Sequence, residues 1–197
     1  MSKEVVIIDY GAGNIQSIQF ALDRLGFTSF LSHDKDEISK AEKVIFPGVG
    51  HAESAMKMLK EKGLHNIIVD LKQPVLGICL GMQLMCKSTE EGPTEGLGIF
   101  DVEVKLFKTD QKVPHMGWNL IKSLKSDLLK GLPEETYMYF VHSFYVPTNQ
   151  ESIADSDYVF PFCAALQKNN FYGVQFHPEK SGNWGERILS NFLSLKL

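Results

Sequence analysis

Short apolar runs alternate with helical patterns in the first half of the chain. The β-branched run over residues 4–10 predicts a buried strand, and residues 27–31 and 43–46 predict two more. Apolar residues recur at helical spacing over residues 15–25 and again over residues 52–63, where glycines end both patterns. Strands that alternate with helices favour right-handed crossovers and a mainly parallel sheet, so the predicted fold class is α/β.

The second half of the chain has a different rhythm, with short strands and little helix between them. Residues 127–130 predict a single helical turn, and residues 184–193 form an amphipathic helix that should pack on the sheet. We expect the strands to be antiparallel additions to the same sheet or a small second sheet, within a single domain over residues 1–197. The predicted strands are residues 99–107, 115–121, 137–142, 152–154, 162–167 and 171–176.

Composition narrows the class of protein. The chain has 197 residues, of which 44% are hydrophobic, and its formal net charge of -4 gives no basic surface for nucleic acid. No apolar run of about 18 residues predicts a membrane span, and no signal peptide is expected. Three cysteines without paired spacing indicate a reducing compartment, the cytoplasm, and no zinc-ligand spacing is present. We expect Cys86 and Cys163 to be buried packing residues.

One stretch changes character at a predicted junction between strand and helix. Residues 74–78 form an apolar run too short for a buried helix, and good helix formers follow Cys79. Gly77 and Gly81 flank the cysteine, and a strained turn needs such small neighbours. The pattern is typical of a nucleophile elbow, and the helix N-terminus behind Cys79 should favour the thiolate. A buried structural thiol is the alternative.

A nucleophilic cysteine needs a base, and the chain has six histidines. His33 and His65 lie in polar surroundings and are expected at the surface. His177 follows an apolar run, precedes a proline that fixes a turn, and lies two residues before Glu179. A carboxylate there can hold the imidazole tautomer and stabilise the imidazolium. A turn histidine beside a surface glutamate is the alternative.

Acyl transfer also needs N–H donors for an oxyanion. The backbone amide of Leu80, directly after Cys79, supplies one donor in the geometry of an elbow. Val49 at the neighbouring strand end could supply the other, because Gly48 and Gly50 leave its peptide free to rotate. We hypothesise that this half of the oxyanion hole is assembled by rotation of the Gly48–Val49 peptide. An ordinary Pro-Gly turn is the alternative.

Three motifs together resemble those of the class I (triad-type) glutamine amidotransferases. The resemblance runs in order over almost the whole chain, and it implies a flavodoxin-like α/β fold with flanking helices and no metal or organic cofactor. The motifs are Pro-Gly-Val-Gly at residues 47–50, Gly-Ile-Cys-Leu-Gly-Met-Gln at 77–83 and Val-Gln-Phe-His-Pro-Glu at 174–179. Residues 9–14, 114–119 and 140–143 further resemble the branch of this family that works in histidine biosynthesis.

The resemblance implies a role for each matching residue. Cys79 would attack the side-chain amide of glutamine, and His177 would protonate the departing ammonia and then activate water to release glutamate from the thioester. The further roles that it implies are substrate binding by Gly48, Gly50, Gln83, His142, Ser143 and Phe144, and a place at a subunit interface near an ammonia tunnel for Trp118, Tyr139 and Lys180. Without the resemblance, Gln83 would be a helix surface residue, and Trp118 and Tyr139 would be core aromatics.

The implied partner is a cyclase subunit with a (β/α)8 barrel, which forms a heterodimer with the glutaminase. It would use the ammonia to make imidazole glycerol phosphate and an aminoimidazole carboxamide ribotide. One alternative is the glutaminase partner of pyridoxal phosphate, anthranilate or aminodeoxychorismate synthesis, and residues 114–119 argue against it. Another is a non-catalytic regulatory subunit, against which the intact Cys79, His177 and Glu179 argue.

Overall fold

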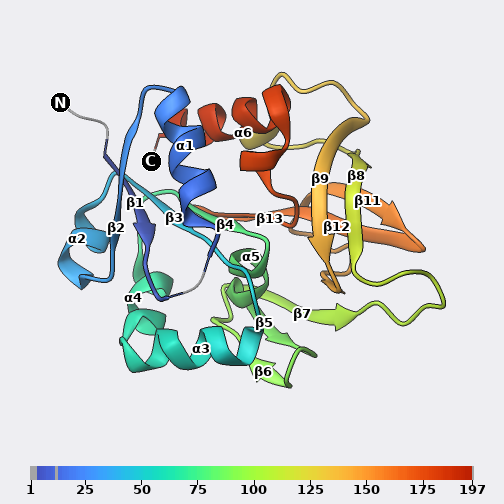
Figure 1. Cartoon of the computed structure of the whole chain (residues 1–197), viewed down its shortest axis with the longest axis horizontal. Helices are drawn as coiled ribbons and strands as arrows, with labels where there is room; N and C mark the ends of the chain where they lie inside the picture. Colours follow the sequence, from blue (N-terminus) through green and yellow to red (C-terminus); the bar gives the residue numbers. More distant parts are fainter. Residues whose placement is uncertain (1–3, 12, 197) are drawn as a thin grey trace.

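The computed structural model describes residues 4–11 and 13–196 of the chain. Residues 1–3, Ala12 of the 9–14 motif and Leu197 lie outside the described residues. A central sheet runs through the middle of the molecule, with helices on both faces (Figure 1). Its strands lie in the order β11 (Ser152–Tyr158), β12 (Phe160–Lys168), β13 (Phe171–Val174), β4 (Val75–Ile78), β3 (Lys43–Phe46), β1 (Glu4–Ile8) and β2 (Thr28–Ser32).

Most neighbouring strands of this sheet run parallel. The pairs from β13 through β4, β3 and β1 to β2 are parallel, whereas β12 and β11 join the sheet as antiparallel strands at one edge. The predicted α/β class, with a mainly parallel sheet and an antiparallel extension, is confirmed.

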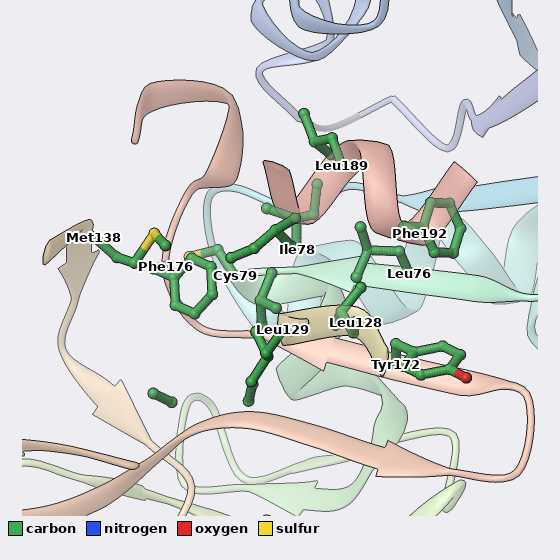
Figure 2. Close-up of a cluster of buried hydrophobic side chains, with 14 of the residues drawn as sticks. Leu76, Ile78, Cys79, Leu128, Leu129, Met138, Tyr172, Phe176, Leu189 and Phe192 are labelled. Atoms are coloured by element: carbon green, nitrogen blue, oxygen red, sulfur yellow. The ribbon is translucent and has the colours of Figure 1, made fainter. Parts of the chain in front are cut away.

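Alternate residues of the parallel strands face two separate hydrophobic clusters. In β1, Val5 and Ile7 belong to one cluster and Val6 and Ile8 to the other. Because both faces are covered, these strands are apolar at almost every position. Figure 2 shows part of the first cluster, in which Leu76 and Ile78 of β4 lie close to side chains of the C-terminal helix.

The helices form the outer layers. The first cluster packs under α1 (Ile15–Arg24) and α6 (Gly182–Ser194), which lie together on one face of the sheet (Figure 1). The other face is covered by α2 (Lys35–Lys40), α3 (Ala52–Glu61), α4 (Leu64–Asp70) and α5 (Leu80–Met85). The helix expected after Cys79 has only six residues, because the backbone becomes extended at Cys86, where β5 begins. Neither α2 nor α4 was predicted from the sequence.

The remaining strands form smaller sheets beside the central one. One is a four-stranded sheet of β5 (Cys86–Thr89), β6 (Thr94–Glu95), β7 (Phe100–Leu106) and β10 (Phe144–Tyr145). The other is an antiparallel ribbon of β8 (His115–Ile121) and β9 (Thr136–His142), which lies beside β11 and β12 (Figure 1). Both expected arrangements for the second half therefore occur together. Two 3-10 turns, η1 (Asp127–Leu129) and η2 (Pro178–Lys180), complete the described elements.

Two predicted strands of this half are clearly longer than expected, since residues 162–167 belong to β12 (Phe160–Lys168) and residues 152–154 to β11. The strand predicted at residues 152–154 extends to Tyr158, because it pairs along almost its whole length with β12. The helical turn predicted at 127–130 is present as η1. Among the described residues, no helix has the length and apolar character required to cross a bilayer.

Candidate active site

Three neighbouring parallel strands end at the same edge of the sheet. Because β4 lies between β3 and β13, the segments that follow these strands are brought together although they are far apart in the sequence. Residues 47–50 follow β3, Cys79 follows β4, and residues 175–179 follow β13. The carboxyl edge of a parallel sheet is where α/β folds bind ligands.

The turn after β4 has the backbone of an elbow. Cys79 has φ 53° and ψ -111°, a conformation that residues other than glycine rarely adopt. Its flanking glycines have no room for a side chain: a Cβ on Gly81 would lie 2.0 Å from the carbonyl oxygen of Phe46, and one on Gly77 would lie 2.3 Å from Met85 Cε. The expected need for small residues on both sides of Cys79 is confirmed.

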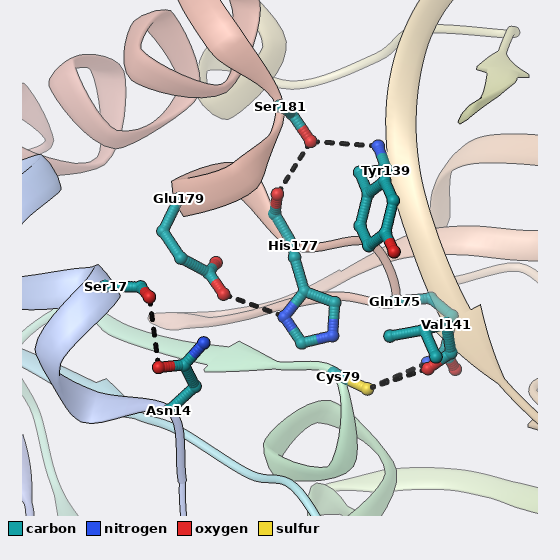
Figure 3. A network of polar contacts seen from close by, with 9 residues as sticks. All are labelled: Asn14, Ser17, Cys79, Tyr139, Val141, Gln175, His177, Glu179 and Ser181. Atoms are coloured by element: carbon teal, nitrogen blue, oxygen red, sulfur yellow. Dashed lines mark hydrogen bonds and ion pairs between the residues drawn. The ribbon is translucent and has the colours of Figure 1, made fainter. Parts of the chain in front are cut away.

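His177 and Glu179 form a buried pair next to this cysteine (Figure 3). Glu179 Oε1 lies 2.8 Å from His177 Nδ1, and the side chains of Glu179 and His177 are 1% and 2% exposed. Because a carboxylate accepts, Nδ1 carries the hydrogen, and the ring turns Nε2 towards the cysteine side of the site. Neither His177 Nε2 nor Glu179 Oε2 has a hydrogen-bond partner among the described residues.

The electrostatics of this pair favour a charged imidazole. Burial alone lowers the pKa of His177, but its interactions with Cys79 and Glu179 outweigh burial and raise that pKa to about 10. The arrangement therefore favours an imidazolium beside the sulfur of Cys79.

The ribbon strand β9 holds the His177 segment in place. The His177 backbone N–H donates to the Tyr139 carbonyl at 2.9 Å. Ser181 Oγ donates to the His177 carbonyl at 2.6 Å and accepts from the Tyr139 N–H at 3.0 Å (Figure 3). Sequence reasoning missed Ser181, because its role depends on the approach of β9 to η2, which no local pattern indicates.

A cavity of about 280 Å³ opens over Cys79 and contains most of the predicted site residues. Gly48 does not line it and packs against the elbow, where a Cβ would be 2.3 Å from the Gly81 nitrogen. Glu91 was not predicted; its Oε2 accepts from the Ala52 N–H at 2.9 Å. The residues that line the cavity are Val49, Gly50, Cys79, Leu80, Gln83, Glu91, Pro114, Val141, His142, Ser143, Phe144, His177 and Lys180.

Two further buried histidines, His115 and His142, contact each other, and His142 lines the cavity. His142 Nδ1 donates to the Phe144 carbonyl at 2.7 Å, so its Nε2 accepts from His115 Nδ1 at 3.0 Å. His115 Nε2 in turn accepts from Asn119 Nδ2 at 3.2 Å. Burial lowers the pKa of His115 to about 4 and that of His142 to about 3. Both rings are therefore neutral, each with its hydrogen on Nδ1.

Of the residues expected at a subunit interface, Trp118 and Tyr139 lie opposite each other on the β8–β9 ribbon, and Lys180 lies on η2. Trp118 is 56% exposed, which rules out the alternative of a core aromatic. Its ring meets that of Tyr139 edge-on, with centroids 6.1 Å apart, and Lys180 Nζ lies 5.9 Å from the Tyr139 ring centroid. Met116 and Tyr137 are also exposed on this ribbon, so it carries an apolar surface of the kind that partners cover.

The remaining cysteines and surface histidines lie outside this cavity. Cys86 and Cys163 are buried free thiols, as expected, and burial raises the pKa of each. His33 is exposed, as predicted, whereas His65 is half-buried because it lies on α4, which was not foreseen. Within residues 4–11 and 13–196, no group of three or more His, Cys, Asp or Glu side chains is arranged to hold a metal ion.

The chain is similar to known proteins over almost its whole length. Residues 6–195 match the family described as glutamine amidotransferase class-I. The imidazole glycerol phosphate synthase subunit HisH of Bacteroides fragilis is 57% identical over 98% of this chain and 100% of that protein. The protein of the same name from Vibrio parahaemolyticus is 47% identical over 98% of each chain.

Solved structures with low sequence identity share the fold. A crystal structure of a glutamine amidotransferase superposes with a TM-score of 0.75 at 18% identity, over 95% of this chain and 96% of that one. The structure of PurLQS from Thermotoga maritima gives a TM-score of 0.75 at 16% identity, over 98% of both chains.

Proposed function

The chain belongs to the class I glutamine amidotransferases, and from this membership we propose that it is the glutaminase subunit of an imidazole glycerol phosphate synthase. Its full-length relatives at 57% and 47% identity carry the name of that synthase's subunit HisH. The observation that carries the proposal is the meeting of Cys79, at a strained elbow, with the buried His177–Glu179 pair over one cavity. The subunit would hydrolyse glutamine to glutamate and pass the ammonia on.

The proposed chemistry uses these three side chains in sequence. The Cys79 thiolate attacks the side-chain carbonyl carbon of glutamine, and the tetrahedral intermediate collapses to a thioester as His177 protonates the departing ammonia. Neutral His177 then removes a proton from water, which attacks the thioester and releases glutamate and the thiolate. Glu179 holds the hydrogen on Nδ1 and stabilises the imidazolium.

The cavity wall supports recognition of the amino-acid end of glutamine. Both hydrogens of Gln83 Nε2 are used, one by the Phe144 carbonyl at 3.0 Å and one by Gln175 Oε1 at 2.8 Å. Gln83 therefore offers only its oxygen, which together with the Glu91 carboxylate suits a substrate ammonium group. Backbone and side-chain groups of Gly50, His142, Ser143 and Phe144 line the same cavity and would position the substrate.

The oxyanion of the tetrahedral intermediate needs two N–H donors, and the backbone amides of Leu80 and Val49 are the proposed pair. Both residues line the cavity. Gly50 has φ 100°, and no atom beyond its chain neighbours lies within 4 Å of the position that a Cβ would take, so the turn that follows Val49 has room to change its backbone conformation. Rotation of the Gly48–Val49 peptide on binding of a partner would tie ammonia release to the presence of an acceptor.

The proposed partner is a (β/α)8-barrel cyclase subunit in the cytoplasm, which forms a heterodimer with this chain. Trp118, Tyr139 and Lys180 would lie at the interface, near the entrance of the path that ammonia follows. Support comes from the exposed aromatic surface of the ribbon and from Lys180, which both lines the cavity and approaches the Tyr139 ring. Strand β9 of the ribbon also anchors His177, because the His177 N–H donates to the Tyr139 carbonyl. A partner bound to the ribbon would therefore contact the strand that holds the base.

The direct test is glutamate release by the purified chain with and without a cyclase subunit and that subunit's ligand. We expect low release by the chain alone and strong stimulation in the complex with ligand, abolished in Cys79→Ala. Stimulated release that survives in Cys79→Ala would contradict the proposed nucleophile.

The choice of partner can be tested separately. A cyclase subunit should be captured by the parent chain, and Trp118→Ala should weaken the complex by about 10- to 100-fold because aromatic anchors dominate interfaces. Leu31→Ala, an exposed apolar residue on the opposite edge strand β2, is the control and should bind normally. Equal affinity of both variants would contradict the assigned surface.

A further inference from the structure

Gln175 is a fully buried amide beside the sulfur of Cys79, and neither the triad nor the proposed substrate contacts use it. In the parallel pairing of β13 with β4, Val174 lies opposite Ile78, so the next residues along the two strands are Gln175 and Cys79. The Cys79 N–H donates to the Val174 carbonyl at 2.8 Å, and the Gln175 N–H donates to the Ala164 carbonyl at 2.9 Å. The backbone thus fixes both residues side by side.

The hydrogen bonds of the neighbouring amides fix which end of Gln175 faces the sulfur. The Phe144 carbonyl can only accept, so it turns Nε2 of Gln83 towards itself. The second hydrogen of that Nε2 goes to Gln175 Oε1 at 2.8 Å. With its oxygen held by Gln83, Gln175 presents its Nε2 to Cys79 Sγ at 3.7 Å.

The sulfur has two polar neighbours with opposite preferences. The Val141 carbonyl, 3.8 Å from Sγ, can accept a hydrogen bond from the neutral thiol, but it repels a thiolate. The Gln175 amide is a donor, so its interaction strengthens when the sulfur is charged. Figure 3 shows both contacts on the side of Cys79 away from Glu179.

We propose that Gln175 is a further catalytic residue, whose amide N–H donates to the Cys79 thiolate and holds the sulfur in its nucleophilic form and orientation. This role rests on the proposed function only in that Cys79 is the nucleophile. It is separate from the oxyanion hole, because its donor faces the sulfur and not the substrate carbonyl. Gln83 and the Phe144 carbonyl act through Gln175 as positioning groups.

The most selective variant is Gln175→Glu. A carboxylate has the same shape and still accepts from Gln83, but it places an oxygen where the N–H faces the sulfur. The measurement is the rate of Cys79 alkylation by iodoacetamide across pH, with the modified residue identified by mass spectrometry. We expect the midpoint of the rate profile to rise by about one pH unit or more. Gln175→Met, which lacks the donor and the charge, should react about tenfold more slowly near neutral pH.

Gln167→Glu is the matched control, since Gln167 is an amide on the adjacent strand β12 whose Nε2 contacts Tyr172 instead. Its alkylation profile should overlay that of the parent. If either Gln175 variant folds, as judged by circular dichroism and thermal unfolding, and its profile also overlays the parent, the proposal is wrong.

A measurement on the unmodified chain decides the case if both variants fail to fold. The side-chain amide signals of Gln175 in ¹H–¹⁵N NMR spectra should shift with the same pH midpoint as Cys79 alkylation, while those of Gln167 should not. If the chemical shifts of the Gln175 side-chain amide do not change over the pH range in which the alkylation rate of Cys79 changes, the proposal is wrong. Because alkylation needs no glutamine, a chain without glutaminase activity but with the expected profiles would contradict the proposed function and leave the role of Gln175 intact.

Discussion

The pKa values of two buried histidines in this molecule are shifted in opposite directions. His177, paired with Glu179 beside Cys79, has its pKa raised to about 10, whereas burial lowers the pKa of His142 to about 3. Both rings are nearly inaccessible to water, so burial is not what distinguishes the two histidines. The difference lies in their partners: an acid and a thiol for His177, a carbonyl and a neutral imidazole for His142.

The contrast separates two tasks. A ring that can take a charge suits proton transfer, so His177 fits the role of acid and base. The neutral His115–His142 pair has fixed tautomers, so it fits the role of a rigid support for the Phe144 carbonyl and, through it, for the Gln83 and Gln175 amides. Substitution of His177 should therefore lower the rate of glutamate release much more than substitution of His115.

The largest expected effect comes from removing the base. His177→Asn should lower stimulated glutamate release by about 10⁴-fold, because proton transfer to ammonia and from water both depend on the ring. His115→Gln should lower it by less than about tenfold, because it removes a supporting contact and no proton carrier. Steady-state assays in the complex with a cyclase subunit make the comparison. Equal losses in the two variants would remove the distinction between the sites.

A smaller loss should follow Glu179→Gln, which keeps the shape and removes the charge. We expect a fall of about 10²- to 10⁴-fold in the rate of glutamate release, because the imidazolium loses its partner.

The free energy of unfolding should also change with pH in a defined sense. Because the pKa of His177 is raised, its contribution is complete below about pH 6.5 and is lost as pH rises through about 10. Denaturant unfolding should therefore show that the difference in free energy of unfolding between the parent and Glu179→Gln becomes smaller as pH rises from about 6.5 to about 10.

The neutral pair should produce the opposite pH dependence. The pKa of His115 is lowered to about 4, so its neutral form stabilises the fold above about pH 6.5, and this contribution is lost as pH falls through 4. Compared with His115→Gln, the parent's free energy of unfolding should fall more steeply between these values, by at most about 1.4 kcal/mol per pH unit. Urea unfolding at several pH values measures both slopes. Parallel slopes would show that the ring is not held neutral.

The smallest expected effect concerns the other side of the cavity. Gly50→Val should change stimulation by the cyclase ligand several-fold, with a smaller change in the KM for glutamine, because it restricts the turn next to the peptide that would present the Val49 amide. Gly98→Val is the matched control, since Gly98 also has positive φ and open space around it but lies away from the cavity. Unchanged stimulation in Gly50→Val would count against peptide rotation.

The parallel strands and the elbow could be predicted in large part from the sequence. The strands have continuous apolar runs, and the Gly77 and Gly81 positions mark a turn that backbone contacts then leave without space for a side chain. The exposed Trp118 was expected only through family resemblance. By periodicity alone, an alternating strand does not reveal which side a partner will cover.

The remaining parts of the site depend on contacts between distant segments. Ser181 anchors His177 only because β9 passes η2, and Gln175 reaches Cys79 only because β13 pairs with β4 in one register. Glu91 enters the cavity from the turn beyond β5, which the sequence did not mark as functional. The helix α4 was missed because residues 64–70 contain β-branched residues that do not favour a helix, and packing against the sheet decides their conformation.

The central claim is that Cys79 is the nucleophile and that His177 serves it, and covalent labelling tests this most directly. The assembled complex would be treated with an electrophilic glutamine analogue, and the labelled residue would be located by mass spectrometry. We predict one label per chain, on Cys79, formed much more slowly in His177→Asn and absent from Cys86 and Cys163. Labelling of another residue, or equal rates in parent and His177→Asn, would contradict the claim.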